Sequence, residues 1–134
     1  MSFHGNSQHE SAMWEAGLSV RREVMGDSFV DQSLARTEGT DSAELQRFVT
    51  EHVWGAVWTR PGLDRRSRSL LNLGMLTALR AHEELAGHVR GALNNGLTRE
   101  EIVETIIHTA GYCGAPAELS AMRIVQQTFD AISE

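Results

Sequence analysis

One short segment near residue 95 constrains the fold more than any other part of the chain. Asn94-Asn95-Gly96 is typical of a helix C-terminus, and Thr98-Arg99-Glu100-Glu101 follows as a capping box that begins a new helix. The apolar residues after the capping box, from Ile102 to Ala110, recur at helical spacing. The segment therefore predicts two consecutive helices joined by a short turn.

The same signals predict further helices along the rest of the chain, and no alternating run with a hairpin turn predicts a strand. The apolar pattern is weaker near residue 30. After Ser42, Leu45, Phe48, Val49, His52 and Val53 recur at i, i+3, i+4, i+7 and i+8, which predicts the buried face of an amphipathic helix. The segment 65–80 is apolar on most faces, which predicts a buried central helix. The fold class is therefore all-α, with about six helices. The expected helices begin near Ala12, at Asp41 or Ser42, after Asp64, near Glu83, after Thr98 and at Pro116.

The length of 134 residues predicts one domain. Residues 1–11 are polar and predict a mobile tail, so the helical domain is expected over residues 12–134. No run is long and apolar enough to span a bilayer, and no charged-then-apolar signal segment opens the chain. With a single cysteine, Cys113, no internal disulfide forms, which agrees with a reducing cytoplasm.

The charge of the chain limits its partners and cofactors. The net charge is −6 and the acidic residues are spread along the chain, which argues against a nucleic-acid partner. All twelve positive residues are arginine. Without lysine the chain forms no Schiff base, no internal aldimine with pyridoxal phosphate and no P-loop. Arginine, in contrast, is suited to bidentate binding of carboxylates.

Two histidines are candidates for chemistry. Glu84 and His88 lie one helical turn apart, so the carboxylate can orient the imidazole for proton transfer. The alternative is an exposed i,i+4 pair without a catalytic role. His108 lies near Tyr112 and would share a cavity with His88 if their helices pack antiparallel; the alternative is a hydrogen-bonded core histidine. Glu84, His88 and His108 alone form a sparse ligand set, so no metal is expected.

A cluster of arginines surrounds the start of the helix after Asp64, where unpaired N–H groups also attract anions. This pattern predicts an acid-binding site, and the alternative is a solvated charged face. Trp54 and Trp58 favour a core or an interface over a ligand platform, and Cys113 is expected to be a small buried hydrophobe. The members of the cluster are Arg60, Arg65, Arg66 and Arg68.

Several stretches together resemble the carboxymuconolactone decarboxylase and alkylhydroperoxidase D-type superfamily, from about residue 14 to the C-terminus. The tryptophan-arginine-proline-glycine piece is specific to the decarboxylase branch. Hydroperoxidase relatives carry two cysteines where this chain has Ala81 and Glu84, so a dithiol peroxidase is not expected. The matching stretches are 17–26 (GLSVRREVMG), 54–63 (WGAVWTRPGL), 65–70 (RRSRSL), 84–88 (ELAGH), 94–98 (NNGLT) and 108–116 (HTAGYCGAP).

The resemblance implies a ring-like homo-oligomer, typically a hexamer with a trimer as the alternative, and pockets near subunit contacts. It implies a carboxy-lyase that converts 4-carboxymuconolactone, a lactone dicarboxylate, to 3-oxoadipate enol-lactone in the protocatechuate branch of the β-ketoadipate pathway. No cofactor is needed, because the electrons of the departing carboxylate flow through the ring double bond onto the lactone carbonyl. The substrate is its own electron sink.

Residue roles follow from this chemistry as hypotheses. His88 transfers the proton and Glu84 orients it. Arg68, or Arg60 or Arg65, holds the side-chain acetate, because a tight grip on the departing carboxylate would oppose its loss. The remaining substrate contacts are His108 or Tyr112 at the oxyanion, with Trp58 nearby. The alternatives are a non-catalytic helical binding module, another small-acid decarboxylase, and a single-cysteine peroxidase that uses Cys113.

Overall fold

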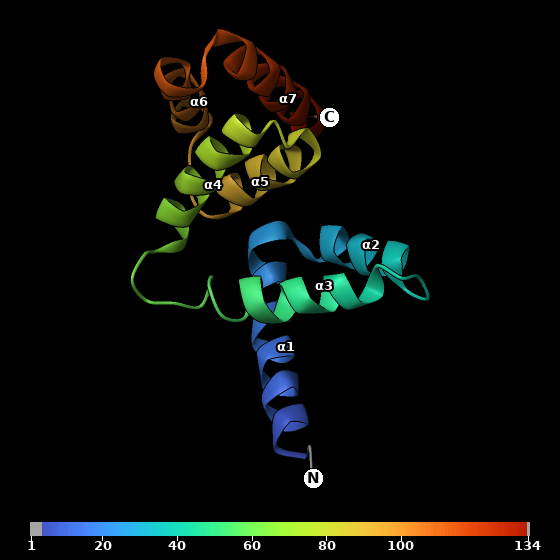
Figure 1. Cartoon of the computed structure of the whole chain (residues 1–134). Helices are drawn as coiled ribbons and strands as arrows, with labels where there is room; N and C mark the ends of the chain where they lie inside the picture. The colour runs from blue at the N-terminus through green and yellow to red at the C-terminus, as the bar shows by residue number, and fades with distance from the viewer. Residues whose placement is uncertain (1–3, 134) are drawn as a thin grey trace. The chain divides into compact units, whose positions relative to one another are not determined.

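The computed structural model describes residues 4–133, with side chains from Ala12 onward, and this part of the chain contains helices and no strand (Figure 1). The all-α prediction is confirmed, with seven α-helices and one π-helical turn in the described residues. No helix in this range is long and apolar enough to cross a membrane. The elements are α1 (His4–Met25), α2 (Asp27–Thr37), α3 (Ala43–Val49), η1 (Thr50–Trp54), α4 (Arg65–Leu79), α5 (His82–Asn94), α6 (Arg99–Cys113) and α7 (Ala115–Ser133).

The contacts divide the chain into two compact units, unit 1 (Met1–Leu63) and unit 2 (Asp64–Glu134). A single domain over residues 12–134 therefore stays a prediction. The first helix begins at His4, earlier than the expected start near Ala12. The predicted mobile tail covers residues 1–11, of which residues 1–3 and the side chains of the rest lie outside the described residues, so its mobility stays a prediction too.

The close packing of α1 against η1 organises unit 1. A Cβ atom on Gly17 would collide with the backbone carbonyl oxygen of Thr50 in η1, and one on Gly55 would collide with that of Met13 in α1. Only glycine permits backbones to approach this closely. Beside this contact lies a small core that includes Val24, which is fully buried.

The segment after Ser42 differs from the amphipathic α-helix that its apolar spacing predicts. Leu45 and Phe48, expected on the buried face, are 64% and 57% exposed, while Thr50 and Trp54 are buried. The physical reason is the packing against α1, because the face with Thr50 and Trp54 is turned towards α1 at the glycine contact and the face with Leu45 and Phe48 is not. The predicted apolar face was therefore wrong for this segment.

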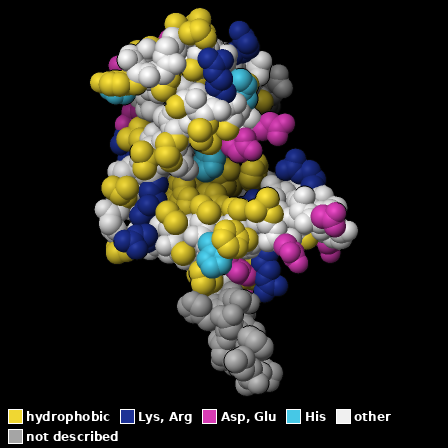
Figure 2. Space-filling view, in the orientation of Figure 1, with side chains coloured by type: hydrophobic (Ala, Val, Ile, Leu, Met, Phe, Trp, Pro, Cys, Tyr) yellow, Lys and Arg dark blue, Asp and Glu magenta, His cyan; other side chains and the backbone are white. Residues whose placement is uncertain are grey.

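Unit 2 is built on α4, which packs against α5 and α6, while α7 covers α5 and α6. The prediction that α4 is buried on most faces is only partly correct. Leu73 is fully buried, but Leu71, Met75 and Leu79 are 53%, 46% and 74% exposed. Hydrophobic side chains lie openly on the visible surface (Figure 2). The core of the unit consists of Leu73, Leu85, Val89, Ala92, Leu97, Ile102, Ile106, Ala121, Val125 and Phe129.

The helix boundaries of unit 2 confirm the predicted start and stop signals. The Asp64 side chain accepts a hydrogen bond from the Ser67 backbone N–H at 2.7 Å and so caps α4. Thr98 and Glu101 form the predicted capping box of α6. Gly96 follows α5 with a φ of 94°, a left-handed conformation that favours glycine.

Substituting Gly17 tests the close contact of α1 with η1. We expect Gly17→Ala to lower the free energy of unfolding by about 1–3 kcal/mol, because the new methyl group meets backbone atoms that cannot rotate away. Urea unfolding followed by far-ultraviolet circular dichroism measures the helices of both units, and tryptophan fluorescence reports on unit 1, since all three tryptophans lie there.

The matched control is Gly74→Ala in α4, where a Cβ atom meets nothing within 4 Å. This change should stabilise the helix by roughly 0.5–1 kcal/mol, because glycine loses more backbone entropy on folding than alanine. Equal effects of the two substitutions would contradict the proposed contact.

Candidate active site

The antiparallel pair of α4 and α5 positions the candidate catalytic histidine. Its turn passes through Arg80, which has a φ of 55° and donates its backbone N–H to the Thr77 carbonyl oxygen at 3.2 Å. At the other end, the Asn95 amide donates to the Ser69 hydroxyl at 2.8 Å. Both ends of the pair are thus fixed, and His88 lies near its middle.

His88 is half-buried between these helices. Its Nδ1 atom lies 3.4 Å from the amide nitrogen of Asn72 on α4. Burial lowers the pKa of His88 below its ordinary value of 6.5, and the charge of Glu84 raises it by less. Neutral imidazole is therefore favoured at neutral pH. Glu84 itself is exposed and acts on the ring through its charge.

Asn72 is a site residue that the sequence analysis missed. It lies one helical turn after Arg68, so both side chains share a face of α4. Arg68 is half-buried on this face. The spacing of Arg68 and Asn72 was visible in the sequence, but their closeness to His88 depends on the register of the two helices. The structure thus joins His88 and Asn72 in one polar cluster, with Arg68 one turn away.

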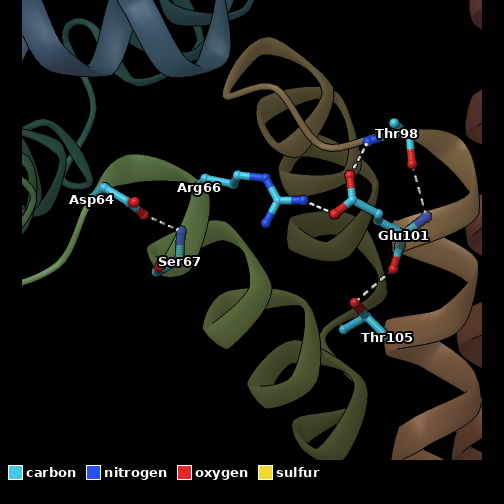
Figure 3. A network of polar contacts seen from close by, with 6 residues as sticks. All are labelled: Asp64, Arg66, Ser67, Thr98, Glu101 and Thr105. Carbon is cyan, nitrogen blue, oxygen red and sulfur yellow. Dashed lines mark hydrogen bonds and ion pairs between the residues drawn. The ribbon is translucent and has the colours of Figure 1, made fainter.

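The arginines of the cluster have different roles, and Figure 3 shows the contact that Arg66 makes. Arg66 forms an ion pair with Glu101 of α6, which ties the start of α4 to the capping box. The carboxylate of Asp64 already occupies the N-terminus of α4, and its hydrogen bonds to Ser67 lower the pKa of Asp64. The position at this helix end that was predicted to attract a substrate anion is therefore taken by the carboxylate of Asp64.

The remaining candidate arginines, Arg60, Arg65 and Arg68, differ in their positions. Arg65 is half-buried, and its backbone carbonyl oxygen accepts a hydrogen bond from Asn95 at 3.4 Å. Arg60 is exposed in unit 1. Of the two remaining candidates in unit 2, Arg65 and Arg68, only Arg68 shares its helix face with Asn72 at a spacing of one turn. It is therefore the stronger candidate for binding a substrate carboxylate.

His108 and Tyr112 lie on an exposed face of α6. Their ring centroids are 5.3 Å apart, and Tyr112 is 82% exposed. The alternative of a core histidine is wrong, because the buried face of α6 is formed by Ile102, Ile106 and Thr109 instead. This helix packs mainly on α4 and α7 rather than on α5. A contact of either ring with substrate stays a prediction.

Trp58 has a core role within unit 1, as the sequence favoured. It is 6% exposed, and its ring stacks on Trp54 with centroids 4.8 Å apart. Such offset aromatic pairs contribute about 0.5–1.5 kcal/mol beyond their buried area. Whether Trp58 also contacts substrate is not tested by this packing, and its binding role stays a prediction.

Two further features lie outside the polar cluster. In the described part of the chain, no three His, Cys, Asp or Glu side chains form a group that could hold a metal ion. Unit 1 contains an open cavity of about 500 Å³ between α1, α2 and α3. Its described lining includes Trp14, Leu34 and Gln46 but none of the predicted site residues. The described lining of this cavity therefore does not include the residues predicted to bind substrate or transfer a proton.

Comparison with known proteins defines the class. Residues 43–127 match the Carboxymuconolactone decarboxylase family. The match covers more than half of the chain and includes α4, α5 and the His88 cluster. The chain belongs to the carboxymuconolactone decarboxylase family.

Full-length relatives extend this match. A nitrosuccinic acid decarboxylase of Metarhizium robertsii is 42% identical over 125 residues, which cover 93% of this chain and 87% of the relative. A 4-carboxymuconolactone decarboxylase of Acinetobacter baylyi is 38% identical over 121 residues, or 90% of each chain. An uncharacterized 15.0 kDa protein of Paracoccus denitrificans is 37% identical over 83 residues, which cover 60% of this chain and 62% of that protein.

The lowered pKa of His88 predicts a pH dependence of stability. Between the folded pKa and the ordinary value of 6.5, the unfolded state binds more protons than the folded state, so stability falls as the pH drops through this window. We expect the wild type to lose more unfolding free energy than His88→Gln between pH 7.5 and pH 5.

Urea unfolding of both proteins across this range measures the difference. The other five histidines are common to wild type and variant, so their contribution cancels. An equal loss in both proteins would show that His88 has the same pKa in the folded and unfolded states.

Proposed function

We propose that this chain decarboxylates 4-carboxymuconolactone to 3-oxoadipate enol-lactone without a cofactor. The observation that supports this most strongly is the half-buried His88–Asn72 cluster, with Arg68 one turn away, in a chain 38% identical to a 4-carboxymuconolactone decarboxylase over 90% of its length. The cluster combines a proton carrier with a cation suited to carboxylates.

The proposed reaction needs no external electron acceptor. The bond between the ring carbon and the departing carboxylate breaks, and its electron pair passes through the ring double bond onto the lactone carbonyl oxygen. The resulting dienolate takes up one proton at the ring carbon next to this carbonyl and gives the enol-lactone. Proton transfer is assigned to His88, with Glu84 acting through its charge. A hydrogen-bond donor to such an oxyanion lowers the activation barrier by roughly 3–4 kcal/mol.

Arg68 is assigned to the carboxylate that remains on the substrate. The charge of the departing carboxylate disappears in the transition state, so a cation bound to it would oppose catalysis. A cation on the side-chain acetate holds the substrate equally before and during the reaction. Substrate contacts of His108, Tyr112, Arg60 or Arg65 remain predictions. A cytoplasmic location of the protein also remains a prediction.

A second candidate substrate is nitrosuccinic acid, because the chain is 42% identical to a nitrosuccinic acid decarboxylase over 93% of its length. The two substrates share a chemical core. In each, the carbon that loses CO₂ also carries a CH₂–COO⁻ group and a group that accepts an electron pair, which is the unsaturated lactone in one and the nitro group in the other. One site is thus able to serve both reactions.

Turnover of each acid by metal-free protein tests the proposal, with products identified by mass. We expect loss of one CO₂ from 4-carboxymuconolactone, and the ratio of kcat/KM for the two acids assigns the substrate. Saturable binding without turnover would favour the non-catalytic alternative. Consumption of peroxide that depends on Cys113 would favour the peroxidase.

Substitutions then test the assigned roles. We expect His88→Ala to lower kcat by about 10²–10⁴-fold, as for loss of a positioned proton carrier. Arg68→Met should raise KM by roughly 10–100-fold, because it removes a charge-assisted hydrogen bond. Arg66→Met is the matched control, since Arg66 is paired with Glu101 and should affect stability rather than KM. A kcat of His88→Ala within threefold of wild type would rule out the role of His88.

We further propose that the chain forms a homo-oligomer, a hexamer in preference to a trimer. The exposed apolar side chains of α4 support this, because Leu71, Met75 and Leu79 would be covered at a subunit contact. Analytical ultracentrifugation should show a mass several times 14.8 kDa. Met75→Asp combined with Leu79→Asp should shift it towards the monomer, and a monomeric wild type would contradict the proposal.

A further inference from the structure

We propose that Asn72 is a positioning residue that fixes the tautomer of His88, so that Nε2 carries the proton and meets the substrate. The contact that carries this inference joins the Asn72 amide nitrogen to His88 Nδ1 at 3.4 Å. An amide nitrogen only donates hydrogen bonds. Nδ1 must then accept, and in a neutral imidazole an accepting Nδ1 leaves the proton on Nε2.

The helix arrangement makes Asn72 suited to this role. Asn72 and His88 are sixteen residues apart and lie on facing helices whose relative position is fixed by the Arg80 turn and by the Asn95–Ser69 hydrogen bond. Beneath them, Leu73 and Val89 are completely buried in the core. The amide and the ring are therefore held against each other by elements that do not depend on a ligand.

Glu84 does not provide the same control. A carboxylate accepts hydrogen bonds and would favour a proton on the nitrogen that faces it. Glu84 is exposed, and its charge affects His88 less than burial does. The assignment of an orienting role thus moves from Glu84, on the same helix, to Asn72 on the neighbouring one.

The catalytic consequence rests on the proposed function. As the C–COO⁻ bond breaks, the electron pair collects on an oxygen of the substrate, the lactone carbonyl oxygen or a nitro oxygen. A ring with its proton on Nε2 presents a donor to this oxygen. The opposite tautomer would present a lone pair to the same oxygen and would repel the developing charge.

The tautomer itself is measured without substrate, by ¹⁵N NMR of the full chain labelled at histidine, at pH 7.5. We expect the His88 signals, assigned by their absence in His88→Gln, to show a pyridine-type Nδ1 and a pyrrole-type Nε2. A pyrrole-type Nδ1 in the wild type would overturn the inference, because it would place the Asn72 carbonyl oxygen against the ring.

Asn72→Asp replaces the donating amide nitrogen by an accepting carboxylate oxygen in a side chain of nearly the same shape. Its carboxylate only accepts, so we expect the proton to move to Nδ1 or the ring to become doubly protonated. Asn72→Ala removes the contact and should give a mixture of tautomers. Unchanged His88 signals in both variants would overturn the inference.

Asn95→Ala is the matched control, because Asn95 also joins α5 to α4 but contacts Ser69 and the Arg65 backbone. It should lower stability and leave the His88 tautomer unchanged; a changed tautomer would show that loosening the helix pair is sufficient and would overturn the specific role of Asn72. If the proposed function holds, Asn72→Asp should also lower kcat by about 10–100-fold with KM within about threefold. Absence of turnover by the wild type would contradict the proposed function. The NMR measurement would still decide the tautomer of His88.

Discussion

The antiparallel packing of α4 on α5 is the contact on which the rest of unit 2 depends. It buries Leu73 against Leu85 and Val89, all of them fully inaccessible, and each such side chain contributes about 1.5–3 kcal/mol on burial. The same packing takes an imidazole out of water and places an amide beside it. The apolar core and the polar cluster are therefore two results of one helix register, and a shift of that register would remove both.

Sequence reasoning predicted the local structure well wherever a short-range signal existed. The Thr98 capping box, the Asp64 cap and the glycine after α5 depend on residues within one turn of each other, so they are visible in the chain itself. Asn72 carried no such signal, since its partner lies sixteen residues away and meets it only through tertiary packing. Apolar spacing also overestimated burial on α4, because a helix that is apolar on most faces still has one face turned away from its own core.

The polar groups around the start of α4 show how a charged cluster separates into distinct tasks. Glu101 accepts from the Thr98 backbone with one carboxylate oxygen and pairs with Arg66 through the other. One side chain thus ends the turn before α6 and also joins α6 to α4. Arg66 cannot be told apart from Arg65 or Arg68 by composition, and only the position of Glu101 assigns it to the framework.

The π-helical turn at Thr50–Trp54 makes the number of residues in this segment as important as their identity. Inserting one more residue before this turn, without a further π-helical turn to absorb it, would rotate every later side chain by about 100° around the axis. Trp54 and Trp58 would then leave the core of unit 1, and Gly55 would no longer lie at its close backbone contact. Over evolutionary time, this segment should therefore accept changes of side chain more readily than insertions, whereas loss of one residue within the π-helical turn would restore an α-helical turn and leave the later side chains in place.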